Sequence, residues 1–280
     1  MSWLTDLVRP RIQKLVKRDT PDNLWEKCPG CEQMVFVREL LDNLSVCKHC
    51  QHHFYVSPQE RCKQLFDEGH FKTLALDAPP DDPLRFKDKK RYTDRLKEAR
   101  ARKKEAIFLA TGLLHKRPLT VAAFDFRFIG GSMGMGVGEA LLKGAQHALQ
   151  AKTPYLTISS SGGARMQEGA LSLMQMARST VGVVRLKEAG LPFISLLTHP
   201  TTGGVAASFA SIGDLNLAEP GALIGFTGAR VIQETLRTTL PKGFQTAEFQ
   251  LEHGALDAVV HRHDLKQTLF KVISHLKKAA

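Results

Sequence analysis

This sequence contains no apolar run that is long enough to cross a membrane. No stretch reaches about eighteen consecutive apolar residues, so we expect no membrane-spanning helix and no membrane insertion. The first fifteen residues carry charges at positions where a secretory signal peptide needs an apolar segment. We therefore expect a cytoplasmic protein.

Two common catalytic motifs are also missing. The chain has no G-x-x-x-x-G-K-[ST] phosphate-binding loop. The glycines of residues 134–139 miss the dinucleotide pattern G-x-G-x-x-G by one position. These absences argue against a P-loop nucleotide site and a Rossmann dehydrogenase.

Four of the five cysteines lie in the first fifty residues as two C-x-x-C pairs. Cys28 and Cys31 form the first pair, and Cys47 and Cys50 form the second after fifteen intervening residues. Two such thiolate knuckles are typical of a structural zinc site with four protein ligands and no open position. Two disulfides, or four unrelated thiols, are the alternatives. Zinc thiolates agree with a reducing cytosolic environment.

A short helix is expected between Ser57 and Gly69. Ser57 is suited to cap its N-terminus, Pro58 fits the first helical position, and Glu60 completes a capping box. Cys62, the fifth cysteine, falls on the same helical face as apolar residues, so we interpret it as a packed core thiol.

The net charge of +11 is unevenly distributed along the chain of 280 residues. Residues 85–104 hold eleven Lys and Arg against three Asp and Glu, and this segment is expected to be helical through about residue 106. Such a segment is usually a solvated helical face. An acidic protein, a phosphorylated ligand or nucleic acid are the partners that it would suit. Only Phe86 and Tyr92 interleave with the charges, which weakens a base-stacking role.

From residue 111 onward, apolar runs end in glycine-rich turns and are followed by helical patterns. This repetition predicts an α/β domain. The expected strands are 119–124, 155–158, 193–197 and 223–226, and the expected helices are 137–150, 166–188, 205–212 and 231–240. The whole chain divides into a basic arm (1–25), a zinc module (26–55) with strand candidates at 35–37 and 53–56, a helical basic connector (56–110) and the α/β domain (111–280).

The glycine turns themselves suggest a chemistry. Glycine after a strand lets the backbone approach a ligand, and the next helix begins with unpaired N–H groups. Two such N–H groups form an oxyanion hole, which stabilises negative charge on a thioester or amide oxygen. Ordinary turn glycines are the alternative, and glycine spacing alone does not identify a substrate.

Five stretches together resemble one known family. They are CPGCEQMVFVRELLDNLSVCKHC, DFRFIGGSMGMGVGEA, SSSGGARMQEGALSLMQMAR, THPTTGGVAASFASIGD and AEPGALIGFTGARVIQET. From about residue 25 to its end, the chain resembles the β subunits of bacterial acetyl-CoA carboxylase carboxyltransferase. The resemblance implies a crotonase-like (ClpP/crotonase) α/β fold preceded by a four-cysteine zinc ribbon.

The resemblance also implies a reaction and partners. Family members transfer a carboxyl group from carboxybiotin to acetyl-CoA and form malonyl-CoA for fatty acid biosynthesis. They act with an α subunit in an α2β2 heterotetramer. Biotin is supplied on the biotin carboxyl carrier protein, and ATP is used by the biotin carboxylase component. Because the biotin enolate can take up the methyl proton, the protein needs charge stabilisation more than a side-chain base.

Site residues follow from the matched stretches. Carried over position by position, the oxyanion glycines are Gly203 and Gly204, the turns on the acyl-CoA side hold Gly131, Gly162 and Gly163, and the candidate substrate-binding arginines are Arg165 and Arg230. For Arg165, the favoured interpretation is a structural one, in which it holds the loop at the start of a helix. At 228–230 the chain departs from the commoner family pattern, so the resemblance does not define the pocket wall near Arg230.

Two rival functions are compatible with parts of the sequence. A ClpP-like serine peptidase shares the architecture, and Ser208 stands where its nucleophile would, but no histidine follows on a later strand end. His253, the next histidine downstream, falls in a segment expected to be a helix end. Nucleic-acid binding through the zinc ribbon and the basic segment is a second activity that would coexist with the enzyme.

Overall fold

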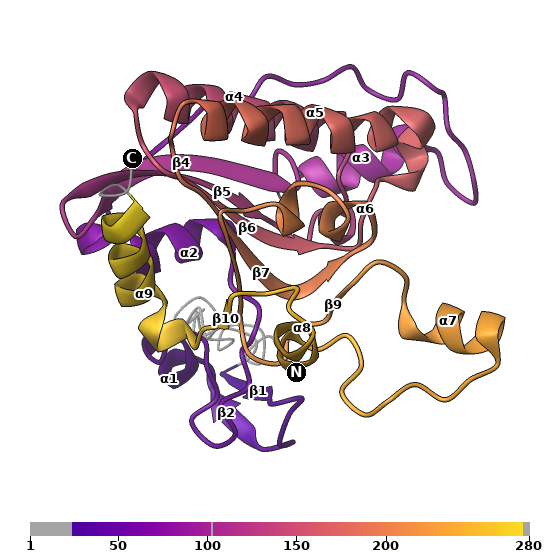
Figure 1. Ribbon diagram of the computed structural model, residues 1–280. Coiled ribbons are helices and arrows are strands. Elements are labelled where there is room, and N and C mark those ends of the chain that lie inside the picture. Colours follow the sequence, from indigo (N-terminus) through magenta and orange to yellow (C-terminus); the bar gives the residue numbers. More distant parts are fainter. Residues whose placement is uncertain (1–23, 102, 277–280) are drawn as a thin grey trace, which may run out of the picture. The chain divides into compact units, whose positions relative to one another are not determined.

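The computed structural model describes residues 24–101 and 103–276 (Figure 1). The chain separates into two compact units, Met1–His52 and His53–Ala280. The expected basic arm, residues 1–25, lies almost entirely outside the described residues. No helix among the described residues is long and apolar enough to span a bilayer.

The first unit is a small module built around a two-stranded antiparallel sheet. Its elements are β1 (Trp25–Lys27), β2 (Met34–Phe36) and α1 (Val37–Asp42). Its buried side chains are Cys28, Val35, Leu40, Ser45, Val46 and Cys47. An apolar core this small provides little folding free energy, so a module of this size needs another source of stability.

The described part of the second unit contains an eight-stranded sheet. Its strands are β3 (Phe71–Thr73), β4 (Ile107–Leu114), β5 (Arg117–Phe124), β6 (Tyr155–Ser161), β7 (Phe193–Thr202), β8 (Leu215–Ala218), β9 (Ile224–Gly225) and β10 (Ala258–Val259). The order is β10-β8-β7-β6-β5-β4-β3, and β9 also pairs with β7. Strands β5 to β8 run parallel, whereas β3 and β4 are antiparallel additions at one edge.

Helices cover both faces of this sheet (Figure 1). The cluster on one face joins alternate residues of β5, Ala122 and Phe124, to α4 (Met135–Ala151) and α5 (Gly169–Glu188). The intervening residues, Val121 and Ala123, belong to a second cluster with α2 (Pro58–Leu65) and α9 (Arg262–Leu276). Because successive strand residues point to opposite faces, β5 lies at the centre of a three-layered unit.

Shorter helices complete the second unit. They are α3 (Tyr92–Arg100), α6 (Gly203–Ala206), α7 (Ala229–Leu236) and α8 (Ala247–Glu252), with 3₁₀ turns at Asp67–Gly69, Ile129–Gly131, Met166–Glu168 and Phe209–Ser211. In Figure 1, α7 stands out from the rest of this unit at the end of an extended connection.

Most elements agree with the expectations from sequence. Helix α2 begins at Pro58, and the side chain of Ser57 accepts a hydrogen bond from the Glu60 backbone N–H. Residues 53–56, expected as a strand, form no strand. The expected connector, residues 56–110, contributes α2, β3 and part of β4 to the second unit and is not a separate part.

Two expected helices are shorter than the sequence indicated. The basic helix begins only at Tyr92, because Asp82 and Asp88 accept the backbone N–H groups of Phe86 and Lys90 and stabilise turns there. The helix expected at 205–212 is interrupted after α6, where the Ser208 hydroxyl donates to the Gly204 carbonyl at 2.7 Å.

A buried group of charged residues connects three elements of the second unit. Glu219, which follows β8, accepts paired hydrogen bonds from Arg61 of α2 at 2.5 and 2.8 Å. It also accepts two from Arg262 of α9 at 2.8 and 2.7 Å. Burial opposes the charged carboxylate, but Arg61 and Arg262 hold the pKa of Glu219 well below its usual range.

We predict that Glu219→Gln destabilises the protein by about 3 kcal/mol or more at pH 7, because two buried guanidinium groups lose their counter-charge. The carboxylate stabilises the fold above the unfolded pKa of about 4.3, and this effect is lost as the pH falls through the lower folded pKa. The deficit of the variant should therefore shrink in acid. Urea unfolding across this pH range measures it. Glu98→Gln, at an exposed ion pair with Lys90, is the control and should change little.

Candidate functional site

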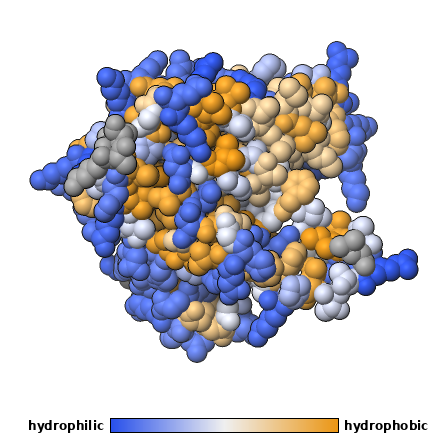
Figure 2. All heavy atoms as spheres, viewed as in Figure 1, coloured by the Kyte–Doolittle hydropathy of each residue, from blue (hydrophilic) through white to orange (hydrophobic). Residues whose placement is uncertain are grey.

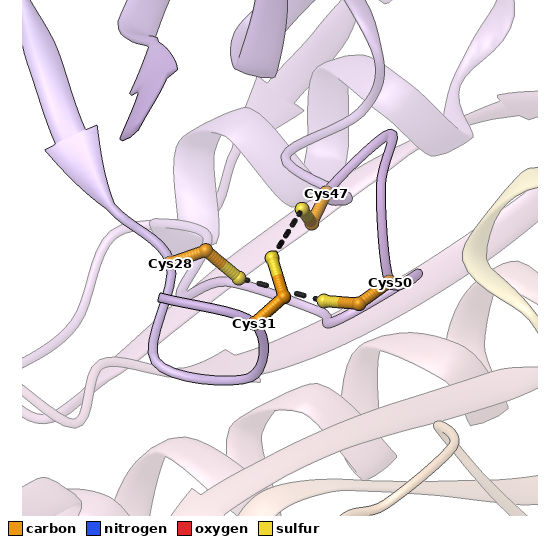
Figure 3. Close-up of side chains that lie close together, drawn as sticks. All are labelled: Cys28, Cys31, Cys47 and Cys50. Carbon is orange, nitrogen blue, oxygen red and sulfur yellow. Dashed lines mark hydrogen bonds between the residues drawn. The ribbon is translucent and has the colours of Figure 1, made fainter. Parts of the chain in front are cut away.

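The first unit brings the four paired cysteines together (Figure 3). Their sulfur atoms all lie within 4.8 Å of one another, and no disulfide joins them. The Sγ atoms of Cys28 and Cys50 are 3.5 Å apart, and those of Cys31 and Cys47 are 3.8 Å apart. A zinc ion with ligands at about 2.3 Å sets sulfur–sulfur distances of about 3.8 Å. The cluster therefore fits a structural zinc ion with four thiolate ligands.

The backbone around these thiols also suits metal ligation. A side chain at Gly30 would lie 3.1 Å from the Cys50 sulfur, so glycine permits the close approach of the two knuckles. Burial opposes the thiolate of Cys47, but hydrogen bonds from the backbone of Cys50 and His49 lower its pKa to about 7. Burial and the neighbouring sulfurs raise the pKa of Cys50 to about 12. A divalent cation removes this conflict, because it favours deprotonation of all four thiols.

We predict that Cys50→Ser abolishes zinc binding and speeds amide hydrogen exchange in residues 24–52, because ligand binding supplies folding free energy to a module with a small core. Exchange in the second unit should not change. Cys62→Ala is the matched control, since Cys62 is buried in the second unit and should leave one zinc per chain. Elemental analysis measures the metal. Wild-type protein that contains no zinc after purification without chelators would contradict the assignment.

In the second unit, the glycine-rich segments meet at the carboxyl ends of neighbouring parallel strands. The IGGSMG turn (129–134) follows β5, the SGGAR turn (161–165) follows β6, and the TTGG turn (201–204) includes the end of β7. Since these strands are parallel neighbours, their carboxyl ends lie side by side, which is where ligands bind in open α/β sheets.

The SGGAR and TTGG turns touch through their backbones. A side chain at Gly163 would lie 3.1 Å from the Gly203 Cα atom, and one at Gly203 would lie 3.1 Å from the Gly163 Cα atom. Both residues also have positive φ angles, +110° and +58°. Glycine is required at both positions, because any other residue adds a clash and backbone strain.

The IGGSMG and SGGAR turns are joined by three backbone hydrogen bonds. Met133 N–H donates to the Gly163 carbonyl at 2.8 Å, and Arg165 N–H donates to the Met133 carbonyl at 2.9 Å. Gly162 N–H donates to the Gly130 carbonyl at 2.9 Å. A side chain at Gly131 would overlap the Ser160 carbonyl oxygen, so this turn also depends on close backbone contact.

These contacts leave few backbone donors for a ligand. Besides Gly162, Gly163 donates to the Ser161 hydroxyl at 3.0 Å, and Gly203 donates to the Phe226 carbonyl at 3.0 Å. Within the described parts of the chain, the N–H groups of Gly204 and Ala164 have no such partner. The two residues are neighbours, since a side chain at Gly204 would lie 3.5 Å from Ala164 Cβ. Among the candidate glycines, Gly204 thus keeps an N–H group that the fold does not use, and Ala164 has another. The N–H groups of Gly162, Gly163 and Gly203 are used within the turns.

Arg165 is buried and bonded by the protein. Its side chain is 1% exposed, and its guanidinium makes five hydrogen bonds to protein acceptors. Nε bonds to the Ser132 hydroxyl, one terminal nitrogen bonds to Tyr92 and Glu168, and the other bonds to Glu105 and the Ser132 carbonyl, at 2.6–3.2 Å. The substrate-binding role expected for Arg165 therefore has no free donor to support it.

Other candidates from the sequence have different outcomes. Ser208 is buried, and its hydroxyl donates to the Gly204 carbonyl, so it is not presented as a nucleophile. Arg230 is the second residue of α7, and its role stays a prediction. In the basic segment, Lys90, Arg95 and Arg100 form ion pairs with acidic residues of the same unit, which reduces the charge available to nucleic acid.

A cavity of about 590 Å³ lies between residues 73–79 and 100–108. Three acidic side chains border it, and all have protein partners. Asp77 accepts from the Lys143 ammonium group at 2.8 Å. Glu105 accepts from Arg165, and Asp125 accepts from the Tyr55 hydroxyl at 2.6 Å. The cavity therefore offers no free pair of carboxyl groups for general acid–base catalysis.

Family models match both units. Residues 61–250 match the carboxyl transferase domain, and residues 25–50 match the acetyl-CoA carboxylase zinc finger domain. The chain is 54% identical over 279 residues to the acetyl-coenzyme A carboxylase carboxyl transferase subunit beta of Granulibacter bethesdensis, covering 99% of this chain and 91% of the relative. It is 53% identical over 281 residues to the protein of the same name from Methylobacterium sp. (strain 4-46), covering 100% and 93%.

Solved structures share the fold at lower identity. A Pseudomonas malonate decarboxylase hetero-dimer matches with a TM-score of 0.59 and 21% identity, covering 80% of this chain and 86% of that chain. Transcarboxylase 12S with methylmalonyl-coenzyme A bound matches with a TM-score of 0.63 and 22% identity, covering 83% and 43%. At this identity the likeness supports the crotonase-like architecture of the second unit.

Proposed function

Because the chain belongs to the family of acetyl-CoA carboxylase carboxyl transferase β subunits, we propose that it transfers a carboxyl group from carboxybiotin to acetyl-CoA and forms malonyl-CoA. The observation that carries this proposal is the pair of unpartnered N–H groups, Gly204 and Ala164, at two touching turns. The hydroxyl of Ser208, the candidate nucleophile of the peptidase alternative, is bonded to the Gly204 carbonyl, which disfavours that alternative.

The two N–H groups suit the charge that this reaction develops. When the methyl group of acetyl-CoA loses a proton, negative charge builds on the thioester oxygen, and two fixed donors stabilise it. Carboxybiotin supplies the carboxyl group and, after giving it up, takes the methyl proton. The protein then needs no side-chain base, in agreement with the engaged carboxyl groups of Glu105, Asp125 and Glu168.

We assign the biotin side of the reaction to a partner chain. One face of α5 is apolar and exposed along its length. Its residues are Leu173, Met174, Ala177, Val181 and Val184, and the four large ones are 46–59% exposed. Figure 2 shows orange surface at the upper right, over the ends of α5 and α6. A stripe of this kind marks an interaction site, and its proposed occupant is the carboxyltransferase α subunit of an α2β2 heterotetramer.

The wider complex supplies the remaining components. Biotin arrives on the biotin carboxyl carrier protein, and ATP is consumed by the biotin carboxylase, so neither needs a resident site in this chain. The thiolate cluster requires a reducing compartment, which agrees with the cytosol. The zinc ion is structural, since its four positions are all filled by cysteine.

A proline at Gly204 tests the proposed donor directly. Gly204 is the second residue of α6, where proline is tolerated because the N–H has no helical acceptor. We predict that Gly204→Pro lowers the turnover of the assembled complex by about 100–1,000-fold, the usual effect of losing one oxyanion donor. Malonyl-CoA formation, measured with carboxybiotin and the α subunit, reports the loss.

Gly204→Ala is the matched control for this substitution. Both variants place a methyl group or ring against the Met176 sulfur, at 3.0 Å from the added carbon, but alanine keeps the N–H. The alanine variant should therefore retain most of the activity. Normal turnover by a folded and assembled Gly204→Pro variant would remove Gly204 from the list of donors.

The α5 stripe leads to a prediction about assembly. The double variant Leu173→Glu, Val181→Glu should weaken the affinity for the α subunit by about 30-fold or more, because two charges enter an apolar contact. Size-exclusion chromatography with light scattering measures complex formation. Leu113→Glu, at an equally exposed leucine of β4, is the control. The chain without its partner should form no malonyl-CoA, and tight binding by the double variant would place the partner elsewhere.

A further inference from the structure

Arg165 is a buried cation that the proposed reaction does not use directly. It lies one residue after Ala164, and its guanidinium reaches across to the IGGSMG turn. We infer that Arg165 is a positioning residue that, together with Glu105 and Glu168, fixes the SGGAR turn and thereby aims the Ala164 N–H group at the thioester oxygen. This inference rests on the proposed function.

The main-chain and side-chain contacts of Arg165 converge on the same turn. Its backbone N–H donates to the Met133 carbonyl, while its guanidinium donates to the carbonyl and the hydroxyl of Ser132. The IGGSMG turn is therefore held at two successive residues by Arg165. A rotation of the SGGAR turn would have to break both sets of bonds.

Two carboxylates hold the guanidinium from the other side. Glu105 bonds to it at 2.6 Å, and Glu168 bonds to it at 3.2 Å. Burial disfavours the charged form of Arg165, but Glu105 and Glu168 raise its pKa, so the cation is retained. The planar guanidinium supplies five donors in a fixed geometry, which the single ammonium group of lysine does not reproduce.

The same carboxylates extend the support to neighbouring elements. Glu168 accepts the Tyr92 hydroxyl at 2.6 Å and the Met135 backbone N–H at 2.5 Å. A side chain at Gly134 would lie 2.5 Å from this carboxylate, so the IGGSMG turn leaves room for it. Helices α3 and α4 and two of the turns thus share one buried ionic network.

The position of Arg165 distinguishes this role from general stabilisation. One peptide bond links Arg165 to Ala164, the residue that carries the proposed donor. A shift of the Arg165 backbone therefore moves the Ala164 N–H group. A displacement of about 1 Å in an active site lowers rates by about 100-fold. A substrate contact would act differently, since it would change the affinity for acetyl-CoA.

The test compares Arg165→Met, Arg165→Lys and Glu105→Gln in the complex with the α subunit. We expect Arg165→Met to lower kcat by about 100-fold while the KM for acetyl-CoA changes by less than about 3-fold. Arg165→Lys, which keeps the charge but not the five donors, should recover only part of the loss, and Glu105→Gln should lower kcat in the same direction. Arg117→Met, at the opposite end of β5, is the control and should behave as wild type.

Three outcomes would overturn the inference. A raised KM with unchanged kcat would assign Arg165 to substrate binding, and a lower melting temperature with unchanged kcat per folded chain would assign it to stability alone. Full activity of Arg165→Lys would show that charge suffices.

A second measurement is independent of activity. Amide hydrogen exchange in the isolated chain should become faster at residues 129–135 and 161–168 in Arg165→Met or, if that variant does not fold, in Arg165→Lys. Unchanged exchange there overturns the inference. A wild-type complex without carboxyl transfer would instead defeat the proposed function, and the exchange data would still decide whether Arg165 holds the turns.

Discussion

The candidate site depends on one contact, the backbone approach of Gly163 to Gly203 across adjacent strand ends. Because neither residue has a side chain, the two turns lie close enough to make neighbours of Ala164 and Gly204, the two donors proposed for the oxyanion. Main-chain donors have no rotamer freedom, so their direction is set entirely by the turns. The hydrogen bonds from the IGGSMG turn and the contacts of Arg165 then hold the SGGAR turn in place.

Two buried groups of charged residues in the second unit connect different elements through the same kind of ion pairing. Glu219 between Arg61 and Arg262 connects helices α2 and α9 to the end of β8. Arg165 between Glu105 and Glu168 connects turns at the strand ends. In both, a single charge lies between two opposite ones, so removing the central charge leaves two like charges buried without a counter-charge. Such groups favour one arrangement of the elements that they join.

Much of this could be predicted from sequence. The zinc site was predictable because the spacing of Cys28 to Cys50 reflects short-range geometry, and the α/β domain because its strand, glycine turn and helix pattern repeats. The structure confirms both predictions. Which of the candidate N–H groups the fold itself uses could not be predicted, since that depends on partners such as Ser161 and Phe226. The burial of Arg165 was equally inaccessible, because Tyr92 and Glu105 are distant in sequence. The sequence did contain a signal for Ala164, since this residue lies between Gly163 and Arg165 in the matched SGGAR stretch. A search restricted to glycines passes over it.

The apolar face of α5 has a consequence for the life of the protein in the cell. If the α subunit covers this face as proposed, a chain that folds before the subunits assemble exposes Leu173, Met174, Val181 and Val184 to water and to other unassembled copies. Surplus copies would then be recognised by chaperones and proteases, or would self-associate, in proportion to their excess over the partner. Matched synthesis of the two subunits would thus be a requirement for solubility, set by the surface of one helix and separate from any demand of catalysis.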